Sequence, residues 1–142
     1  MKDSSVLFLQ LKERVPSDAY MALKQSLENA DDAKFEAIMF INFKSPILGL
    51  LLSSIVPGID RIYKGDVALG IFKFVYVILA YLFFNLYYEL TGFEDERLFF
   101  ALSLALLLAV IWVISDIFLI YKAIKKDNLK KIFEILKSDY AD

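Results

Sequence analysis

The sequence begins and ends with charged stretches in which apolar residues recur at intervals, and between them lie long segments that are almost wholly apolar. In residues 1–43 the apolar positions are three or four apart, which is typical of short amphipathic helices. Pro16 ends the first helix, because a residue before proline avoids the helical conformation. We expect Ser17 to cap the second helix and Asp31 or Asp32 to cap the third. The expected buried faces are Val6, Leu7, Phe8 and Leu11, then Tyr20, Leu23, Leu27 and Ala30, and then Phe35, Ile38 and Met39.

Both flanking regions have two interpretations. The N-terminal unit is either a small helical bundle whose apolar faces pack on one another, or a docking module for a partner or the membrane surface. Amphipathic patterns of this kind favour the bundle. Beyond Asp127 the tail repeats apolar residues at helical spacing: Leu129, Ile132, Phe133 and Leu136. We expect an amphipathic helix there, which either lies on the inner leaflet of a membrane or packs on the N-terminal unit.

The apolar middle contains one short and two long segments. The first segment, residues 45–59, has an apolar core at 47–57. As a helix this core would be about 17 Å long, which is too short for a hydrocarbon layer of about 30 Å. This segment is either a re-entrant helix or a poor span that extends back through residues 38–43. The segments 67–88 and 98–121 are each long enough to cross a membrane and carry one charge each, Lys73 and Asp116.

Charges at the segment ends predict an orientation. The loop 89–97 is acidic, whereas the tail after residue 121 is rich in lysine. Because lysine and arginine gather on the cytoplasmic side, we expect a multi-pass protein of the cell inner (cytoplasmic) membrane with a cytoplasmic C-terminus and an external loop 89–97. The turn at residues 60–66 then also lies in the cytoplasm. We expect the N-terminus to be cytoplasmic too, because the chain shows no signal peptide that would move a charged unit across.

Composition excludes several classes of chemistry. Hydrophobic residues make up 58% of the sequence, well above ordinary soluble domains. The net charge of −2 offers no basic footprint for nucleic acid. The absence of Cys and His removes thiolate nucleophiles, imidazole bases and the usual zinc ligands. We therefore expect no enzymatic activity, no catalytic residue, no metal and no cofactor.

Ionisable groups inside the apolar segments are the main candidates for a site, because such groups face protein or water rather than lipid. Lys73 and Asp116 lie at similar depths from the cytoplasmic ends of their segments, and we predict that Asp116 pairs with Lys73 or Arg61. Alternatively, Lys73 extends its side chain to the headgroups. With Asp60, these residues form either a proton or ion relay or an ion-paired clasp, and the clasp is favoured.

Small residues repeat along the third apolar segment. Ala101, Ala105 and Ala109 are four apart and therefore share one helix face, on which another helix can approach closely. The sequence does not decide between packing within this chain and packing in a homo-oligomer.

Several motifs resemble the TM-two domain family of membrane proteins, bacterial type. They are Lys44-Ser45-Pro46, the stretch Pro57-Gly58-Ile59-Asp60-Arg61-Ile62-Tyr63-Lys64-Gly65-Asp66 with Gly70 and Lys73, and Trp112-Val113-Ile114-Ser115-Asp116 with Lys122. By position, the residues that match the family pattern are Gly58, Asp60, Arg61, Tyr63, Gly65, Gly70 and Asp116. Ile62 stands where the family usually has Phe, and the acidic turn near 89–97 is an insertion that turns one helix into two. The resemblance covers residues 44–127 and implies a membrane interaction module.

We therefore expect an all-α integral membrane protein with short N-terminal helices (1–43), a TM-two-like membrane domain (44–127) and an amphipathic basic tail (128–142). The membrane domain contains one short or re-entrant helix and two full transmembrane helices. The expected function is non-catalytic: assembly or interaction with a partner, with lipid bilayer around the helices and a homo-oligomer or a membrane protein as the partner. A small proton- or ion-coupled transporter or channel component is the alternative.

Overall fold

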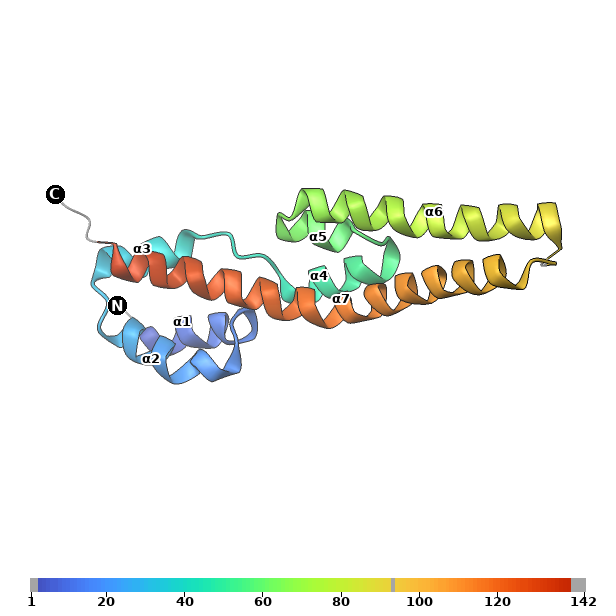
Figure 1. Ribbon diagram of the computed structural model, residues 1–142. Helices are drawn as coiled ribbons and strands as arrows, with labels where there is room; N and C mark the ends of the chain where they lie inside the picture. The colour runs from blue at the N-terminus through green and yellow to red at the C-terminus, as the bar shows by residue number, and fades with distance from the viewer. Residues whose placement is uncertain (1–2, 93, 139–142) are drawn as a thin grey trace. The chain divides into compact units, whose positions relative to one another are not determined.

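The computed structural model describes residues 3–92 and 94–138, and within these ranges it contains helices and no strand (Figure 1). This confirms the all-helical class. The helices are α1 (Ser4–Leu11), α2 (Tyr20–Glu28), α3 (Asp32–Phe40), α4 (Pro46–Ile55), α5 (Ile59–Lys64), α6 (Val67–Thr91) and α7 (Glu96–Lys137), with 3-10 turns at Lys12–Arg14 and Ser17–Ala19. The chain divides into two compact units: residues 47–120 form one, and the residues on either side of them form the other.

The first unit is a helical bundle in which the C-terminal part of α7 packs against α1, α2 and α3 (Figure 1). Its buried core consists of Leu7, Leu11, Val15, Leu23, Leu27, Phe35, Ile38, Phe43 and Ile132. Leu129, Ile135 and Leu136 pack against this core from α7. The N-terminal helices therefore cover the apolar face of the tail. Of the two predicted arrangements, this is the one in which the tail packs on the N-terminal unit.

The tail is not a separate helix, which differs from the predicted arrangement. α7 runs without interruption through 42 residues, from Glu96 to Lys137. The physical reason is that no Gly or Pro occurs in this range, so nothing stops the helix where the composition changes from apolar to basic.

The helix boundaries of the first unit agree in part with the sequence patterns. Val15 is extended (φ −124°, ψ 160°) before Pro16, as expected. The Asp31 side chain accepts a hydrogen bond of 2.7 Å from the Lys34 N–H and caps α3, which is also confirmed. The prediction that Ser17 caps the second helix is wrong. Ser17 opens a 3-10 turn, and α2 begins at Tyr20 without a side-chain cap.

Two residues of the predicted buried faces lie at the surface. Val6 is 49% exposed and Met39 is 57% exposed. Each is next in sequence to a buried residue, Leu7 or Ile38, and neighbours in a helix point about 100° apart. A helix that packs along one stripe buries only one of such a pair.

In the second unit, α6 and the N-terminal part of α7 lie side by side in opposite directions, and α5 lies beside the start of α6 (Figure 1). α4 has 10 residues, and residues 41–45 before it are not helical. The first apolar segment therefore does not join residues 38–43 in one long helix. A helix of this length rises about 15 Å, too little to span a membrane alone.

The turn between the two long helices is shorter than the predicted loop 89–97. α6 continues through Glu89 to Thr91, and α7 begins at Glu96. Gly92 ends α6 with φ 58°, and the Asp95 carboxylate accepts hydrogen bonds from the N–H groups of Arg97 and Leu98. The turn is thus built from a glycine stop signal and an aspartate cap.

Two helices, α6 and α7, are long and apolar enough to cross a membrane. In their most apolar 18-residue windows only 11% and 6% of the residues are buried within the molecule. An apolar helix in the core of a water-soluble domain has most of its residues buried within the molecule.

Candidate functional site

The candidate site is built on the turn between α4 and α6, which two glycines shape. Gly58 (φ 96°) precedes α5 and Gly65 (φ 118°) follows it, so both occupy the left-handed region that glycine adopts without strain. At the end of α5 the Asp66 N–H donates to the Arg61 carbonyl (2.9 Å) and the Gly65 N–H to the Ile62 carbonyl (3.0 Å). This pair of bonds is a Schellman motif, and it fixes how the chain leaves α5 and enters α6.

Gly58 and Gly70 bring the turn into backbone contact with α6. A Cβ atom on Gly58 would lie 2.1 Å from the Gly70 carbonyl oxygen. In the other direction, a Cβ on Gly70 would lie 2.6 Å from the Gly58 carbonyl oxygen. Because no real contact is that short, only glycine fits at these two positions, and the side chains of α5 and α6 are held close together.

Three charged side chains meet in the interior of the second unit. Asp60 of α5, Lys73 of α6 and Asp116 of α7 are all 0% exposed. The Lys73 Nζ lies 3.1 Å from a carboxylate oxygen of Asp60 and 2.8 Å from one of Asp116. Lys73 thus links three helices, and it does not extend toward the molecular surface.

Arg61 completes the pairing of Asp116. Its Nε donates to Asp116 Oδ2 over 3.1 Å, and its second terminal nitrogen donates to Oδ1, so the guanidinium binds the carboxylate through both oxygens. The prediction that Asp116 pairs with Lys73 or Arg61 is confirmed, and it pairs with both. The second oxygen of Asp60 accepts from the Gly58 N–H (3.1 Å), which ties the carboxylate to the start of α5.

The sequence patterns missed two members of this network at its rim. Asp66 lies 2.8 Å from the Lys64 Nζ and 3.6 Å from an Arg61 terminal nitrogen. Both residues belong to the stretch 57–66, which resembles the TM-two pattern. The alternation of acidic and basic side chains in that stretch was the signal that could have identified them. We name Asp60, Arg61, Lys64, Asp66, Lys73 and Asp116 the charge cluster.

The charge cluster is electrically neutral, because three carboxylates face three cations. The hydrogen bond to Asp116 raises the pKa of Arg61, which stays protonated. The hydrogen bond from Lys64 lowers the pKa of Asp66, which stays ionised at neutral pH. Among the described residues, every buried side-chain nitrogen and oxygen atom has a hydrogen-bond partner. Burial of the charges is therefore compensated by pairing, as a low-dielectric interior requires.

The other predicted site residues lie at varied distances from this centre. Tyr63 is half-buried on α5. On α7, Ala109 is buried and Ala101 is exposed, while the Ala105 carbonyl accepts a hydrogen bond of 3.2 Å from the Tyr76 hydroxyl. The small-residue face is thus covered at its Ala109 end and open at its Ala101 end.

An aromatic group adjoins the covered end of that face. The ring centroids of Phe72 and Tyr76 on α6 each lie 5.9 Å from that of Trp112 on α7. Aromatic rings at such separations stabilise the contact between their helices beyond simple burial. The helix pair is therefore held by charges and aromatic rings in the same region.

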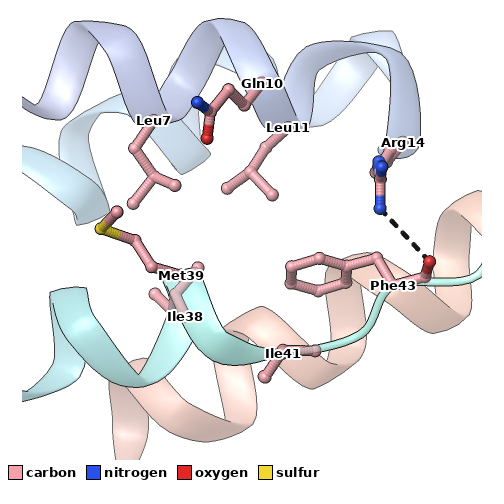
Figure 2. A pocket seen from close by; sticks show the side chains of 8 residues that line it. All are labelled: Leu7, Gln10, Leu11, Arg14, Ile38, Met39, Ile41 and Phe43. Carbon is pink, nitrogen blue, oxygen red and sulfur yellow. Dashed lines mark hydrogen bonds between the residues drawn. The ribbon is translucent and has the colours of Figure 1, made fainter.

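A separate pocket of about 320 Å³ lies in the first unit, between α1 and the end of α3 (Figure 2). It is lined by Leu7, Gln10, Leu11, Arg14, Ile38, Met39, Ile41 and Phe43. Figure 2 shows its ionisable residue, Arg14, at one edge, where a terminal nitrogen donates to the Phe43 carbonyl over 3.3 Å. The lining is otherwise largely apolar and offers no pair of groups for acid-base chemistry.

The side chains of the charge cluster pair with one another and are not arranged to carry out a reaction. It contains no nucleophile next to a base, and the described residues include no group of side chains that could hold a metal ion. No protein-family model, curated protein or solved structure matches this chain. Interpretation of the site therefore depends on its geometry.

Proposed function

We propose that this protein is a non-catalytic integral membrane protein of the TM-two type, which acts as an assembly or partner-interaction module. The observation that carries the proposal is the neutral, fully paired charge cluster between two long helices whose outer surfaces are apolar and exposed. The second unit thus has charged groups inside and apolar groups outside, which is the reverse of a water-soluble domain.

The exposed surface supports a bilayer as the solvent. On α6 and α7 large apolar side chains are between 39% and 73% exposed, among them Ile71, Phe72, Leu82, Leu90, Phe100, Leu107, Phe118 and Leu119. In water, an apolar surface of this extent marks an interaction site or causes aggregation. In a bilayer the same surface faces hydrocarbon, and the helices satisfy their own backbone hydrogen bonds.

The inward charges support the same conclusion. Lys73 and Asp116 are the charged residues of the segments 67–88 and 98–121, and both side chains are buried within the protein. Ionisable groups in membrane helices pair with one another in this way, because a charge that faces lipid is costly. The lysine-rich part of α7 and the charge cluster then lie on the cytoplasmic side, and the turn at Gly92 lies outside.

The resemblance to the TM-two family gains a physical basis in these contacts. Gly58, Gly65 and Gly70 shape the turn, while Asp60, Arg61 and Asp116 form ion pairs. Ile62, the departure from the family pattern, is 43% exposed and makes no part of the charge cluster. Its side chain lies beside Gly70 and pairs with no charge, so a change at that position leaves the ion pairs in place.

The geometry favours a clasp over a proton or ion relay. A relay needs a carboxylate that can release and rebind a proton through water, whereas Asp60 and Asp116 are fully buried and bound to cations. If the variant Asp116→Asn keeps the fold but abolishes an ion flux of the wild-type protein in vesicles, the transporter function is correct and the clasp is not.

Membrane insertion and orientation are tested by cysteine mapping, since the sequence contains no cysteine. Single cysteines at the exposed positions Lys24, Glu94 and Lys126 report on the first unit, the turn before α7 and the basic part of α7. With a membrane-impermeant maleimide, position 94 should react in intact cells, and positions 24 and 126 only after lysis. Release of the wild-type chain by alkaline carbonate, or reaction of position 94 only after lysis, contradicts the proposal.

A further inference from the structure

A second pocket of the first unit carries a distinct chemistry. It has a volume of about 370 Å³ and lies between the turn before α2 and one stretch of α7. It is lined by Pro16, Ser17, Asp18, Tyr121, Lys122, Lys125 and Lys126. We name this the lysine pocket. Three of its lining residues are cations and one is an anion, so its local charge is positive.

Among the residues that the structure describes, the three lysines of this pocket have no carboxylate partner. Elsewhere in the first unit lysines form ion pairs, such as Lys130 with Glu134 (3.7 Å) and Lys34 with Asp31 (3.8 Å). Within residues 3–92 and 94–138, Lys122, Lys125 and Lys126 form no ion pair. Like charges this close in sequence repel one another, and a bound anion removes that repulsion.

Two features hold this charge in place at the pocket wall. The Lys125 Nζ lies 4.7 Å from the centroid of the Tyr121 ring, a cation-π contact one helical turn apart on α7. Lys125 is half-buried, which limits the positions its side chain can take. Asp18 is exposed, and water therefore screens its repulsion of an anion.

The place of the pocket along α7 indicates where the anion comes from, and this step depends on the proposed membrane function. Residues 98–120 form the apolar part of α7, and at about 1.5 Å per residue they cover the hydrocarbon layer of about 30 Å. Tyr121 and Lys122 follow directly. A tyrosine followed by lysines at a span end lies at the level of the lipid headgroups, where anionic lipids bind basic pockets on the cytoplasmic side.

We propose that the lysine pocket binds the phosphate of an anionic phospholipid headgroup. Lys122, Lys125 and Lys126 supply the positive charge, and the Ser17 hydroxyl is an additional donor at the opposite wall. The chemistry recognised is a phosphate oxyanion, and the source is the bilayer rather than a soluble phosphate. Zwitterionic phospholipids carry a compensating ammonium group, which these lysines repel.

The test measures lipid retention by the purified full-length protein in a mild detergent, using native mass spectrometry. Phosphatidylglycerol and phosphatidylcholine with identical acyl chains are the two lipid probes, and sn-glycerol 3-phosphate is the soluble probe. The wild type should retain phosphatidylglycerol at least tenfold better than phosphatidylcholine. The triple variant Lys122→Gln/Lys125→Gln/Lys126→Gln should lose this preference.

A matched triple variant controls for net charge. Lys24→Gln/Lys130→Gln/Lys131→Gln removes the same charge from exposed positions outside the pocket and should keep the preference. Equal loss in both variants, or no preference in the wild type, overturns the proposal. Equally tight binding of sn-glycerol 3-phosphate overturns the lipid as the source. Lys125→Arg keeps the charge and should keep the preference, which separates a binding role from a folding role.

Failure of this inference is distinguishable from failure of the membrane proposal. The lipid assay is done in detergent, whereas membrane insertion is read from carbonate extraction of cells. A chain that resists extraction but shows no lipid preference contradicts only the lysine pocket. A chain that carbonate releases contradicts the membrane function and with it the bilayer as the lipid source.

Discussion

The Lys73 Nζ lies 2.8 Å from the Asp116 carboxylate, although 43 residues separate the two in sequence. Both side chains are fully buried, and Asp60 and Arg61 extend the contact to a third helix. Together these contacts join α5, α6 and α7. It makes the short turn between the hydrophobic helices part of the interior of the second unit.

Removal of the Asp116 charge should destabilise the second unit strongly. Asp116→Asn leaves the buried Lys73 and the half-buried Arg61 without their shared carboxylate, and loss of one partner from a buried pair costs about 3–5 kcal/mol. The free energy of unfolding, measured by circular dichroism during denaturation in detergent micelles, should fall by this order. Glu89→Gln changes an exposed carboxylate of α6 and should stay within about 0.5 kcal/mol of the wild type. Similar losses in both variants would contradict the clasp.

The contact between Lys73 and Asp116 should also appear as energetic coupling. In a double-mutant cycle with Lys73→Met and Asp116→Asn, the double variant should be more stable than the sum of the single losses predicts, by about 0.5–3 kcal/mol. The control pairs Lys73→Met with Glu94→Gln, which lies in the turn after α6, beyond a rise of about 27 Å from Lys73 to Thr91, and should be additive. Additive losses for Lys73 and Asp116 would show that they do not stabilise one another.

The contact between Gly58 and Gly70 should tolerate no side chain. Gly58→Ala combines a positive φ with a Cβ 2.1 Å from the Gly70 carbonyl, so it should cost more than about 3 kcal/mol of unfolding free energy. Gly92→Ala is the matched control, because Gly92 also has a positive φ but open space around it. It should cost only about 1 kcal/mol. Equal costs at the two positions would exclude the close approach of the turn to α6.

Because the pKa of Asp66 is lowered in the folded protein, its ionised carboxylate should stabilise the fold at neutral pH. An aspartate of the unfolded chain has a pKa of about 3.9, and in the folded protein the Lys64 hydrogen bond and the Arg61 charge lower the pKa of Asp66. Between these two values the unfolded state binds more protons, so this contribution is present above about pH 4 and is lost as the pH falls through the folded value.

Comparison of wild type with Asp66→Asn isolates that contribution. Thermal unfolding in detergent should show a stability advantage of the wild type at pH 6, and this advantage should shrink toward pH 2. Asp66 is partly exposed, so solvent and salt keep the effect small, and high salt should reduce it further. An advantage that grows toward low pH would contradict the sign of the shift.

Asn128 should stabilise the first unit through its side-chain hydrogen bonds. Its side-chain nitrogen donates to the carbonyls of Arg14 (3.0 Å) and Lys44 (2.9 Å), and the residue is 1% exposed. Asn128→Ala leaves both acceptors without this donor and should cost about 1–3 kcal/mol. Asn128→Asp places a carboxylate against two carbonyl oxygens and should cost more. Lys130→Ala, at an exposed position of α7, is the control and should have little effect.

The periodic pattern of apolar residues was sufficient for the helical class, for the two long apolar helices and for most of the first unit's buried face. These features follow from local rules: helix propensity, one buried stripe per helix, and proline, glycine and aspartate at helix ends. The pairing of Asp116 with Lys73 and Arg61 was also within reach, because a buried charge must find a counter-charge and few were available at the same depth.

Tertiary contacts decided the remainder. Sequence left open what covers the apolar face of the tail, and the answer is the core around Leu7, Leu23 and Ile38. The absence of Gly and Pro from residues 96–137 was the available sign that α7 is continuous. No pattern indicated that Asn128 bridges the 3-10 turn at Arg14 and the loop at Lys44. Nor did any pattern show why Gly58 and Gly70 are both required. These features depend on which surfaces meet across long sequence separations, and a pattern along one chain records the face of a helix but not the partner that covers it.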